Sequence, residues 1–218
     1  MRFSLFCLVV PLFLSASQAG PISGFGAEGG FSLTYQNWDY KSNVGFGAID
    51  FMNDWDKHFN AGVFIRFLDC KYFSLDADIT YNQKGGLTKN GIQSTGSGDN
   101  GEIVLGPMLE IWDRIDYVSF APRVKFKYSI GKFVPFFSIG PSFDFLVNKS
   151  SFLLDVDIFK NYEVSALYGV GVGYKIDRHL SCFFEFLHQP GISFIYSNSN
   201  VDIKNDVLKF NVGLLYQL

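Results

Sequence analysis

The sequence is poor in the residues and runs that several protein classes require. It contains only 3 Cys, 3 His and 3 Met among 218 residues, and the His and Cys residues form no cluster that would indicate a metal site. Beyond the first twenty residues, no stretch approaches the roughly 18 consecutive apolar residues of a transmembrane helix. Lys and Arg are dispersed along the chain, which argues against a nucleic-acid partner. We expect no metal and no cofactor.

Glycine and aromatic residues are abundant instead. The chain has 22 Gly, 25 Phe and 11 Tyr, and its mean hydropathy of +0.14 is high for a soluble protein. Aromatic residues favour pleated strands, and glycine favours turns over helices. The composition therefore predicts an all-β protein.

The amino-terminal segment has the organisation of a secretory signal peptide. Arg2 supplies the positive charge, residues 3–14 form a short apolar run, and Ser17-Gln18-Ala19 forms a small-x-small cleavage site. We therefore expect residues 1–19 to be a signal peptide and residues 20–218 to be one exported domain. Its two cysteines, Cys70 in a turn and Cys182 on a strand, are expected to be independent thiols.

Residues 72–84 show the pattern that recurs along the chain. Apolar residues from Phe73 to Tyr81 alternate with polar residues from Ser74 to Asn82, which places the two sets on opposite faces of a strand. The same alternation predicts eight strands, at residues 25–37, 59–67, 72–84, 116–128, 133–147, 162–176, 180–189 and 207–218. The segment 102–112 is ambiguous between an extension of the fourth strand and part of a loop.

The connections between these strands alternate in length. Three-residue turns are predicted at 69–71, 130–132 and 177–179, and long loops at 38–57, 85–113, 148–160 and 197–206. Outer-membrane barrels have an even number of strands, short periplasmic turns and long external loops. A soluble exported sandwich or barrel would also show alternating polar and apolar residues. Aromatic residues on nearly every strand favour instead a barrel whose apolar face contacts lipid. We therefore predict an eight-stranded antiparallel transmembrane β-barrel in the bacterial outer membrane.

The polar face of such a barrel would fill its interior, because eight strands leave room for little more than side chains. Buried charges must be paired, so we predict a structural charge cluster that plugs the lumen. Its expected members are Glu28, Arg66, Asp76, Asp78, Arg123, Lys125, Glu163 and Glu185. Proline lacks the N–H that a closed sheet needs, so bulges or strand ends are expected at Pro122, Pro135 and Pro141.

Aromatic residues near the predicted strand ends are expected to anchor the barrel at the membrane interfaces. They are Trp38, Trp55, Trp112, Tyr117 and Tyr162. The loops at 38–57 and 85–113 are the places for a binding function, because loops on a rigid scaffold carry specificity.

Catalytic chemistry has little support in the sequence. The one candidate set for a lipid A-modifying hydrolase is His188 with Ser193 and Glu185, since such an enzyme needs a nucleophile, a base and an orienting carboxylate. Gly169, Gly171 and Gly173 have GxGxG spacing inside a strand, which does not match a dinucleotide-binding turn. We expect no catalytic residues.

Three motifs carry a family resemblance: YNQKGG at 81–86, VPFFSIGPSFDFL at 134–146, and VSALYGVGVGYKI at 164–176 with FFEF at 183–186. With these motifs the chain resembles the PorT-like outer-membrane β-barrel domain of Gram-negative bacteria. The resemblance implies an eight-stranded barrel without catalytic residues, and some members of the family are linked to protein secretion. The last strand is similar to the signal read by the barrel-assembly machinery, at Asn211, Gly213, Tyr216 and Leu218. Leu218 stands where an aromatic residue is usual.

The expected function is a non-enzymatic structural or interaction role through the external loops. Its expected partners are outer-membrane lipid, the assembly machinery during insertion, and a protein bound by the loops. A narrow pore for small solutes and a lipid A-modifying enzyme are the alternatives.

Overall fold

The structure is a computed structural model that describes residues 22–41, 54–88, 93–97, 103–108, 111–151, 160–197 and 201–218. The expected signal peptide, residues 1–19, lies outside the described residues. Within the described part of the chain, no helix is long and apolar enough to span a membrane.

Eight long strands form one antiparallel barrel. They are β1 (Gly24–Tyr40), β2 (Asp56–Asp69), β3 (Phe73–Lys84), β7 (Ile111–Lys127), β8 (Phe133–Ser151), β9 (Tyr162–Lys175), β10 (Leu180–Pro190) and β12 (Val201–Gln217). Four shorter strands accompany them: β4 (Leu87–Thr88), β5 (Gln93–Ser97), β6 (Ile103–Met108) and β11 (Tyr196–Ser197).

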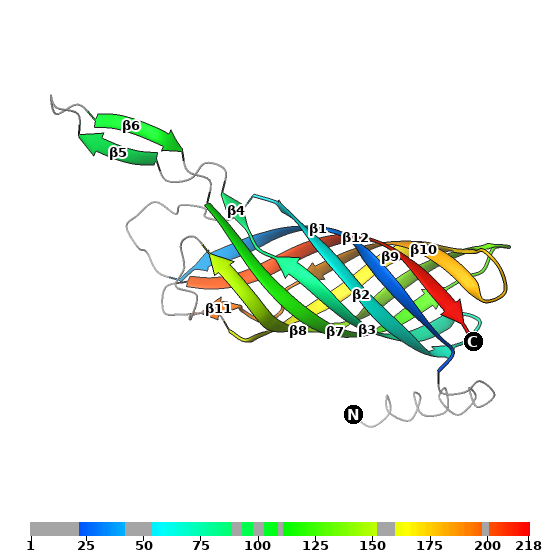
Figure 1. The fold of residues 1–218 in the computed structure, drawn as a ribbon. Helices are drawn as coiled ribbons and strands as arrows, with labels where there is room; N and C mark the ends of the chain where they lie inside the picture. The colour runs from blue at the N-terminus through cyan, green and yellow to red at the C-terminus, as the bar shows by residue number, and fades with distance from the viewer. Residues whose placement is uncertain are drawn as a thin grey trace, which may run out of the picture.

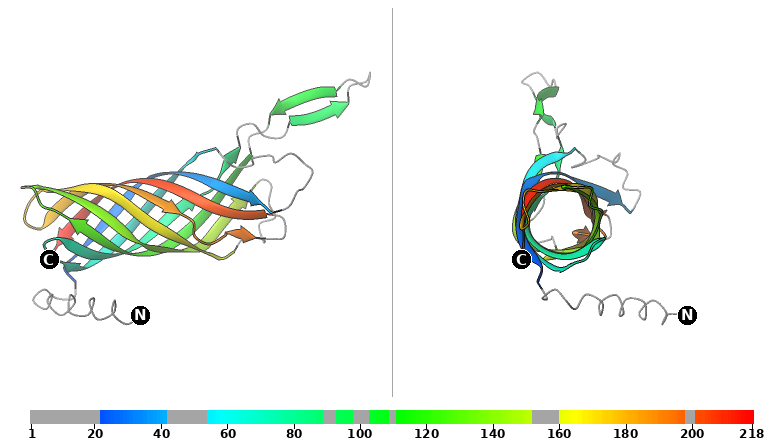
Figure 2. Two further views of the ribbon diagram at one scale, coloured as in Figure 1. Left: turned by 180° about the vertical axis from the view of Figure 1, so that it is seen from behind. Right: turned by 90° about the vertical axis from the view of Figure 1, so that its right-hand side faces the viewer.

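The barrel closes where its first and last strands meet. β1 pairs with β12 from Gly24↔Gln217 to Tyr40↔Val201, so the first and last strands of the sheet leave no free edge between them. Figure 1 shows the inclined strands, and the end-on view in Figure 2 shows the closed ring. The predicted eight-stranded antiparallel barrel is confirmed.

The barrel has one short-turn end and one long-loop end. The turns at 70–72, 128–132 and 176–179 lie at the same end as the start of β1 and the end of β12. β4, β11 and the β5–β6 hairpin lie at the other end (Figure 1). By the rule for bacterial barrels, the short-turn end is periplasmic and the long-loop end is external.

Several strands extend further toward the external end than the alternation predicts. β1 continues to Tyr40, β8 continues to Ser151, and β12 begins at Val201. The prediction of a loop at 197–206 was therefore wrong for its second half. Residues 201–206 read locally as polar loop, but pairing with residues 35–40 of β1 makes them strand. The ambiguous segment 102–112 divides between β6 and the start of β7.

The prediction of bulges or strand ends at the prolines was wrong for two of the three. Pro122 and Pro141 lie inside β7 and β8, and the β7–β8 pairing is interrupted at residues 121–123 and 140–142, where the two prolines are opposite each other. On their other sides, Pro122 pairs with Ala77 and Pro141 with Ala166. The two missing N–H groups thus share one gap in the sheet. Pro135 lies near the start of β8, as expected.

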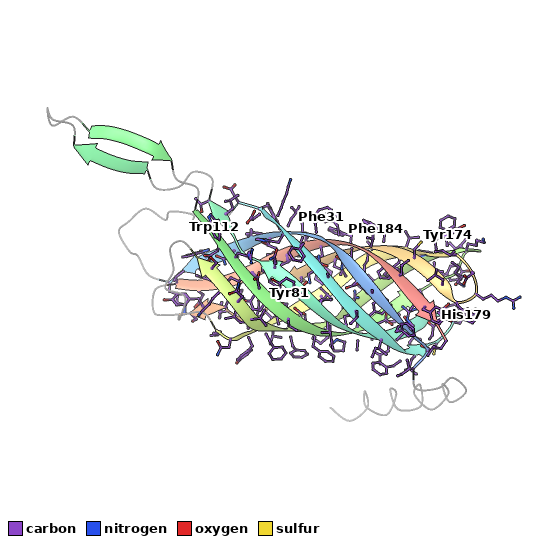
Figure 3. The ribbon with its side chains drawn as sticks, in the orientation of Figure 1. Phe31, Tyr81, Trp112, Tyr174, His179 and Phe184 are labelled. Atoms are coloured by element: carbon purple, nitrogen blue, oxygen red, sulfur yellow. The ribbon has the colours of Figure 1, made fainter. Side chains whose placement is uncertain are left out.

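The outer surface of the barrel is apolar and aromatic, as Figure 3 shows. Side chains exposed there include Phe31, Ile79, Phe126, Val170 and Val212, each more than half exposed. The alternate residues of the same strands face inward and are mostly polar. An apolar exterior around a polar interior is the inverse of a soluble barrel and suits contact with lipid.

Three inward phenylalanines lie over glycines of neighbouring strands. A Cβ added to Gly26 would lie 2.3 Å from Cζ of Phe64. A Cβ added to Gly171 would lie 2.3 Å from Cζ of Phe136, and one added to Gly213 would lie 2.3 Å from Cζ of Phe183. Each glycine therefore leaves the space that a lumen aromatic ring occupies. Glycines on the inward face thus make room for particular side chains inside a narrow barrel.

Gly171→Ala should destabilise the barrel by about 1–3 kcal/mol, because the added methyl overlaps Phe136 in a packed interior. Gly173→Ala is the matched control, since its Cβ would have no neighbour nearer than 3.6 Å. We expect the control to change the free energy of unfolding by less than about 1 kcal/mol. Urea titration in lipid vesicles measures both, and equal effects would contradict the assignment of Gly171 as space for the ring.

Candidate functional site

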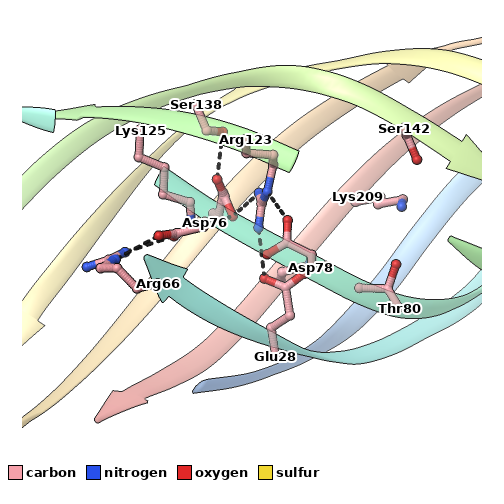
Figure 4. Close-up of polar contacts among 12 residues, drawn as sticks. Glu28, Arg66, Asp76, Asp78, Thr80, Arg123, Lys125, Ser138, Ser142 and Lys209 are labelled. Carbon is pink, nitrogen blue, oxygen red and sulfur yellow. Dashed lines mark hydrogen bonds and ion pairs between the residues drawn. The ribbon is translucent and has the colours of Figure 1, made fainter. Parts of the chain in front are cut away.

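The lumen holds a network of charged side chains organised around Arg123 of β7. Its Nη1 donates to Oε2 of Glu185 at 2.9 Å, its Nε donates to Oδ2 of Asp78, and its Nη2 lies 3.5 Å from Oε2 of Glu28. Arg123 is only 1 % exposed. One guanidinium thus faces three carboxylates from β1, β3 and β10, as Figure 4 shows in part.

Asp76 connects this network to Arg66 and Lys125. Arg66 and Asp76 form a two-pronged ion pair, with Nε–Oδ1 and Nη2–Oδ2 distances of 2.7 and 2.9 Å. Nζ of Lys125 lies 3.4 Å from Oδ2 of Asp76 and 3.7 Å from Oε2 of Glu185. The structure thus brings together seven of the eight side chains predicted for the cluster, with three cations against four carboxylates.

Glu163, the eighth, belongs to a second network nearer the external end. There Nζ of Lys84 lies 2.7 Å from Oδ2 of Asp144 and 2.9 Å from Oε2 of Glu163, and all three side chains are fully buried. Gln189 donates to Asp144 and Asn205 donates to Glu163. The prediction of one cluster was therefore wrong in its grouping, because Glu163 pairs with Lys84.

Sequence reasoning missed Lys84 and left Asp144 out of the predicted cluster. The available signal was parity, because Lys84 is an even number of residues from Asp76 and Asp78 and so shares their face of the strand. At the end of a predicted strand, Lys84 was assigned no role.

Tight packing separates the two networks. Ala121, Leu167 and Leu187 form a small buried apolar cluster at this level. The cavity beside it has a volume of only ≈10 Å³. That volume holds at most about one water molecule.

The external end of the lumen is filled by apolar residues. Tyr117 and Ile203 are completely buried in a cluster with Ile115, Ile195 and Val201, and Trp38 packs against it. Tyr117 and Trp38 therefore face inward, and their prediction as interfacial anchors was wrong. Trp55, Trp112 and Tyr162 are exposed on the barrel, in the position that an anchor needs.

The candidate catalytic set is not assembled. Glu185 is buried in the lumen with Arg123 and Ser138, whereas His188 faces outward between Tyr168 and Asp206, at 2.7 and 2.6 Å. Oγ of Ser193 accepts a hydrogen bond from the backbone N–H of Val164. Among the described residues, no group of three His, Cys, Asp or Glu side chains is placed to hold a metal ion.

Of the four residues of the proposed assembly signal, Asn211, Gly213 and Tyr216 lie in the second half of β12, and Leu218 directly follows the strand. Asn211 is buried and lies 3.4 Å from Glu28, and Gly213 leaves space for Phe183. Tyr216 and Leu218 are exposed on the outside at the periplasmic end.

Comparison with a protein-family model agrees with the fold. A model of the outer membrane protein beta-barrel domain family matches residues 4–215. Three solved structures are similar at low identity: Neisserial surface protein A (TM-score 0.49, 11% identity, covering 89% of this chain and 97% of that one), OprG of Pseudomonas aeruginosa (0.45, 12%, 92% and 98%), and Ail of Yersinia pestis (0.42, 11%, 89% and 99%). A search of curated proteins found no match.

Replacing Asp76 and Asp78 together by Leu should destabilise the folded barrel by about 3–5 kcal/mol, because Arg66, Arg123 and Lys125 would then be buried with too few partners. Equilibrium unfolding in lipid vesicles measures the loss.

Arg66→Met with Asp76→Leu is the matched control, because it removes both members of one pair, while Lys125 keeps Glu185 and Asp69 keeps Lys127 as partners. It should cost less than Asp76→Leu alone. An unchanged unfolding free energy in the double Asp variant would refute the pairing.

Proposed function

The chain belongs to the outer membrane protein beta-barrel domain family and lies in the bacterial outer membrane, and from that premise we propose that it is a non-enzymatic barrel with a plugged lumen that acts through its external loops. The observation that carries the proposal is the pair of buried ionic networks with the apolar packing between them.

The networks favour a plug over a pore. A pore keeps its charged lining in water, whereas the side chains of Arg123, Lys84, Asp144 and Glu163 are at most 1 % exposed. Charges removed from water are retained only when they are paired and hydrogen-bonded. The apolar cluster around Tyr117 adds a second obstruction at the external end.

The external end offers the surface for a partner. β5 and β6 pair as a hairpin, from Gln93↔Met108 to Ser97↔Ile103, and Figure 1 shows it beyond the rim of the barrel. A hairpin held outside a rigid barrel can present a binding edge without disturbing the membrane-spanning part. We propose that this region binds a protein partner, while the aromatic exterior binds outer-membrane lipid.

The finer assignments are part of the same proposal. The three motifs, at 81–86, at 134–146 and at 164–176 with 183–186, support a PorT-like relationship. The exposed Tyr216 and Leu218 at the end of the last strand support recognition by the barrel-assembly machinery during insertion.

Purified protein refolded into a planar bilayer should show no steady conductance, because the two networks obstruct the lumen. A variant with Lys84→Ser, Arg123→Ser, Glu185→Ser and Tyr117→Ser should conduct small ions, since it shortens the central side chains of both networks and the buried ring of the external apolar cluster. Heat-modifiable migration in detergent gels checks that each protein is folded. Steady, reproducible channels formed by the unmodified protein would overturn the plug and favour the narrow pore.

A further inference from the structure

A cavity of ≈350 Å³ lies at the periplasmic end of the lumen, below the network of Arg123. We name it the periplasmic vestibule. It lies among the short turns and the adjoining ends of β2, β3, β7, β8, β9, β10 and β12, and Arg66 and Lys125 are the residues it shares with the network. Its volume is at the lower end of the range for small-molecule sites.

The lining of the vestibule is strongly basic. Five cations, Arg66, Lys71, Lys125, Lys127 and Lys175, line it together with a single carboxylate, Asp69. Asp69 is already shared, because it pairs with Lys127 and lies 3.7 Å from Nη1 of Arg66. Asp76 and Glu185 of the Arg123 network pair with Arg66 and Lys125, so the positive charge that no described carboxylate neutralises is that of Lys71 and Lys175.

Two of these lysines have no carboxylate partner among the described residues. Nζ of Lys175 donates a hydrogen bond to Oγ of Ser129 at 3.4 Å, and Nζ of Lys71 lies 5.0 Å from the ring centroid of Tyr72. Lys71 is exposed in the turn at 70–72 and Lys175 is the last residue of β9, so both lysines lie at the periplasmic rim, where an incoming anion would meet them first.

The inner wall of the vestibule is aromatic. Phe136 and Phe183 line it, and together with Phe64 they surround Nζ of Lys125 at 5.0–5.4 Å from the ring centroids. Val134 and Leu215 add apolar surface. Glycines on neighbouring strands leave space for each of the three rings.

We propose that the periplasmic vestibule is a binding site for a small aromatic carboxylate. The carboxylate is held at the rim by Lys71 and Lys175, and the ring packs against Phe136 and Phe183. Charge excess selects an anion, the aromatic wall selects a flat apolar body, and the volume limits the ligand to a small molecule. The site lies at the opposite end from the loops and does not depend on the function proposed for them.

The test uses the full mature chain in lipid nanodiscs and two fluorinated probes followed by ¹⁹F NMR. 4-Fluorophenylacetate carries the charge, and 4-fluorophenylacetamide is its neutral isostere. We expect saturable binding of the acid and binding of the amide weaker by about tenfold or more, the size of one lost ionic contact. No saturable binding of the acid, or equal binding of both probes, would overturn the proposal.

Two variants assign the site. Lys71→Gln with Lys175→Gln should weaken binding of the acid by about tenfold while leaving the barrel folded, because neither lysine forms an ion pair with a described residue. Ser181→Trp should block the acid by filling the cavity that Ser181 lines. Arg178→Gln is the matched control at the same end, because Arg178 does not line the cavity, and it should leave binding unchanged. Unweakened binding in both test variants, or an equal loss in the control, would place binding elsewhere and refute the site.

Discussion

The guanidinium of Arg123 and its three carboxylates are the interaction on which the rest of the barrel depends. Eight strands enclose a lumen too narrow to keep charged side chains in bulk water, so each charge must find a partner across the barrel. Asp78, Glu185 and Glu28 come from three different strands, and one side chain reaches all three. The ring of strands thus closes around an ionic centre as well as through its β1–β12 seam.

The small volume of the lumen is the second constraint, and side chains fill that volume in successive layers. Paired charges alternate with apolar packing from the periplasmic end to the external end, so that Phe136 and Phe183, the Arg123 network, Leu167 and Leu187, the Lys84 network and Tyr117 follow one another. Each layer excludes water from the next, which strengthens the ion pairs within it. A barrel filled in this way is rigid, and its ligands and partners are left to its two ends.

Period-2 alternation predicted which side chains enter the lumen but not which of them meet. Asp76 and Asp78 share a face by parity, and Arg66 and Arg123 lie on the strands that flank them, so their pairing followed from strand order. Glu163 was assigned to the wrong cluster because its partner depends on the stagger of the strands. The stagger places Nζ of Lys84, on β3, across the lumen within 2.9 Å of Glu163, on β9. The stagger is set by strand pairing around the whole barrel, so it cannot be predicted from the sequence of one strand. The same non-local pairing made a strand of 201–206 and placed Pro122 opposite Pro141.

The central claim, that the paired charges close the lumen between its two ends, is tested most directly by thiol accessibility. The chain is first freed of Cys70 and Cys182 by substitution with Ser, and one cysteine is then introduced at Ser181, in the periplasmic vestibule, or at Ser142, beside the ≈10 Å³ cavity. A membrane-impermeant thiol reagent applied to folded protein in nanodiscs should modify the cysteine at 181 and leave the cysteine at 142 unmodified. Modification of both at similar rates would show a continuous aqueous path past Arg123 and would contradict the account.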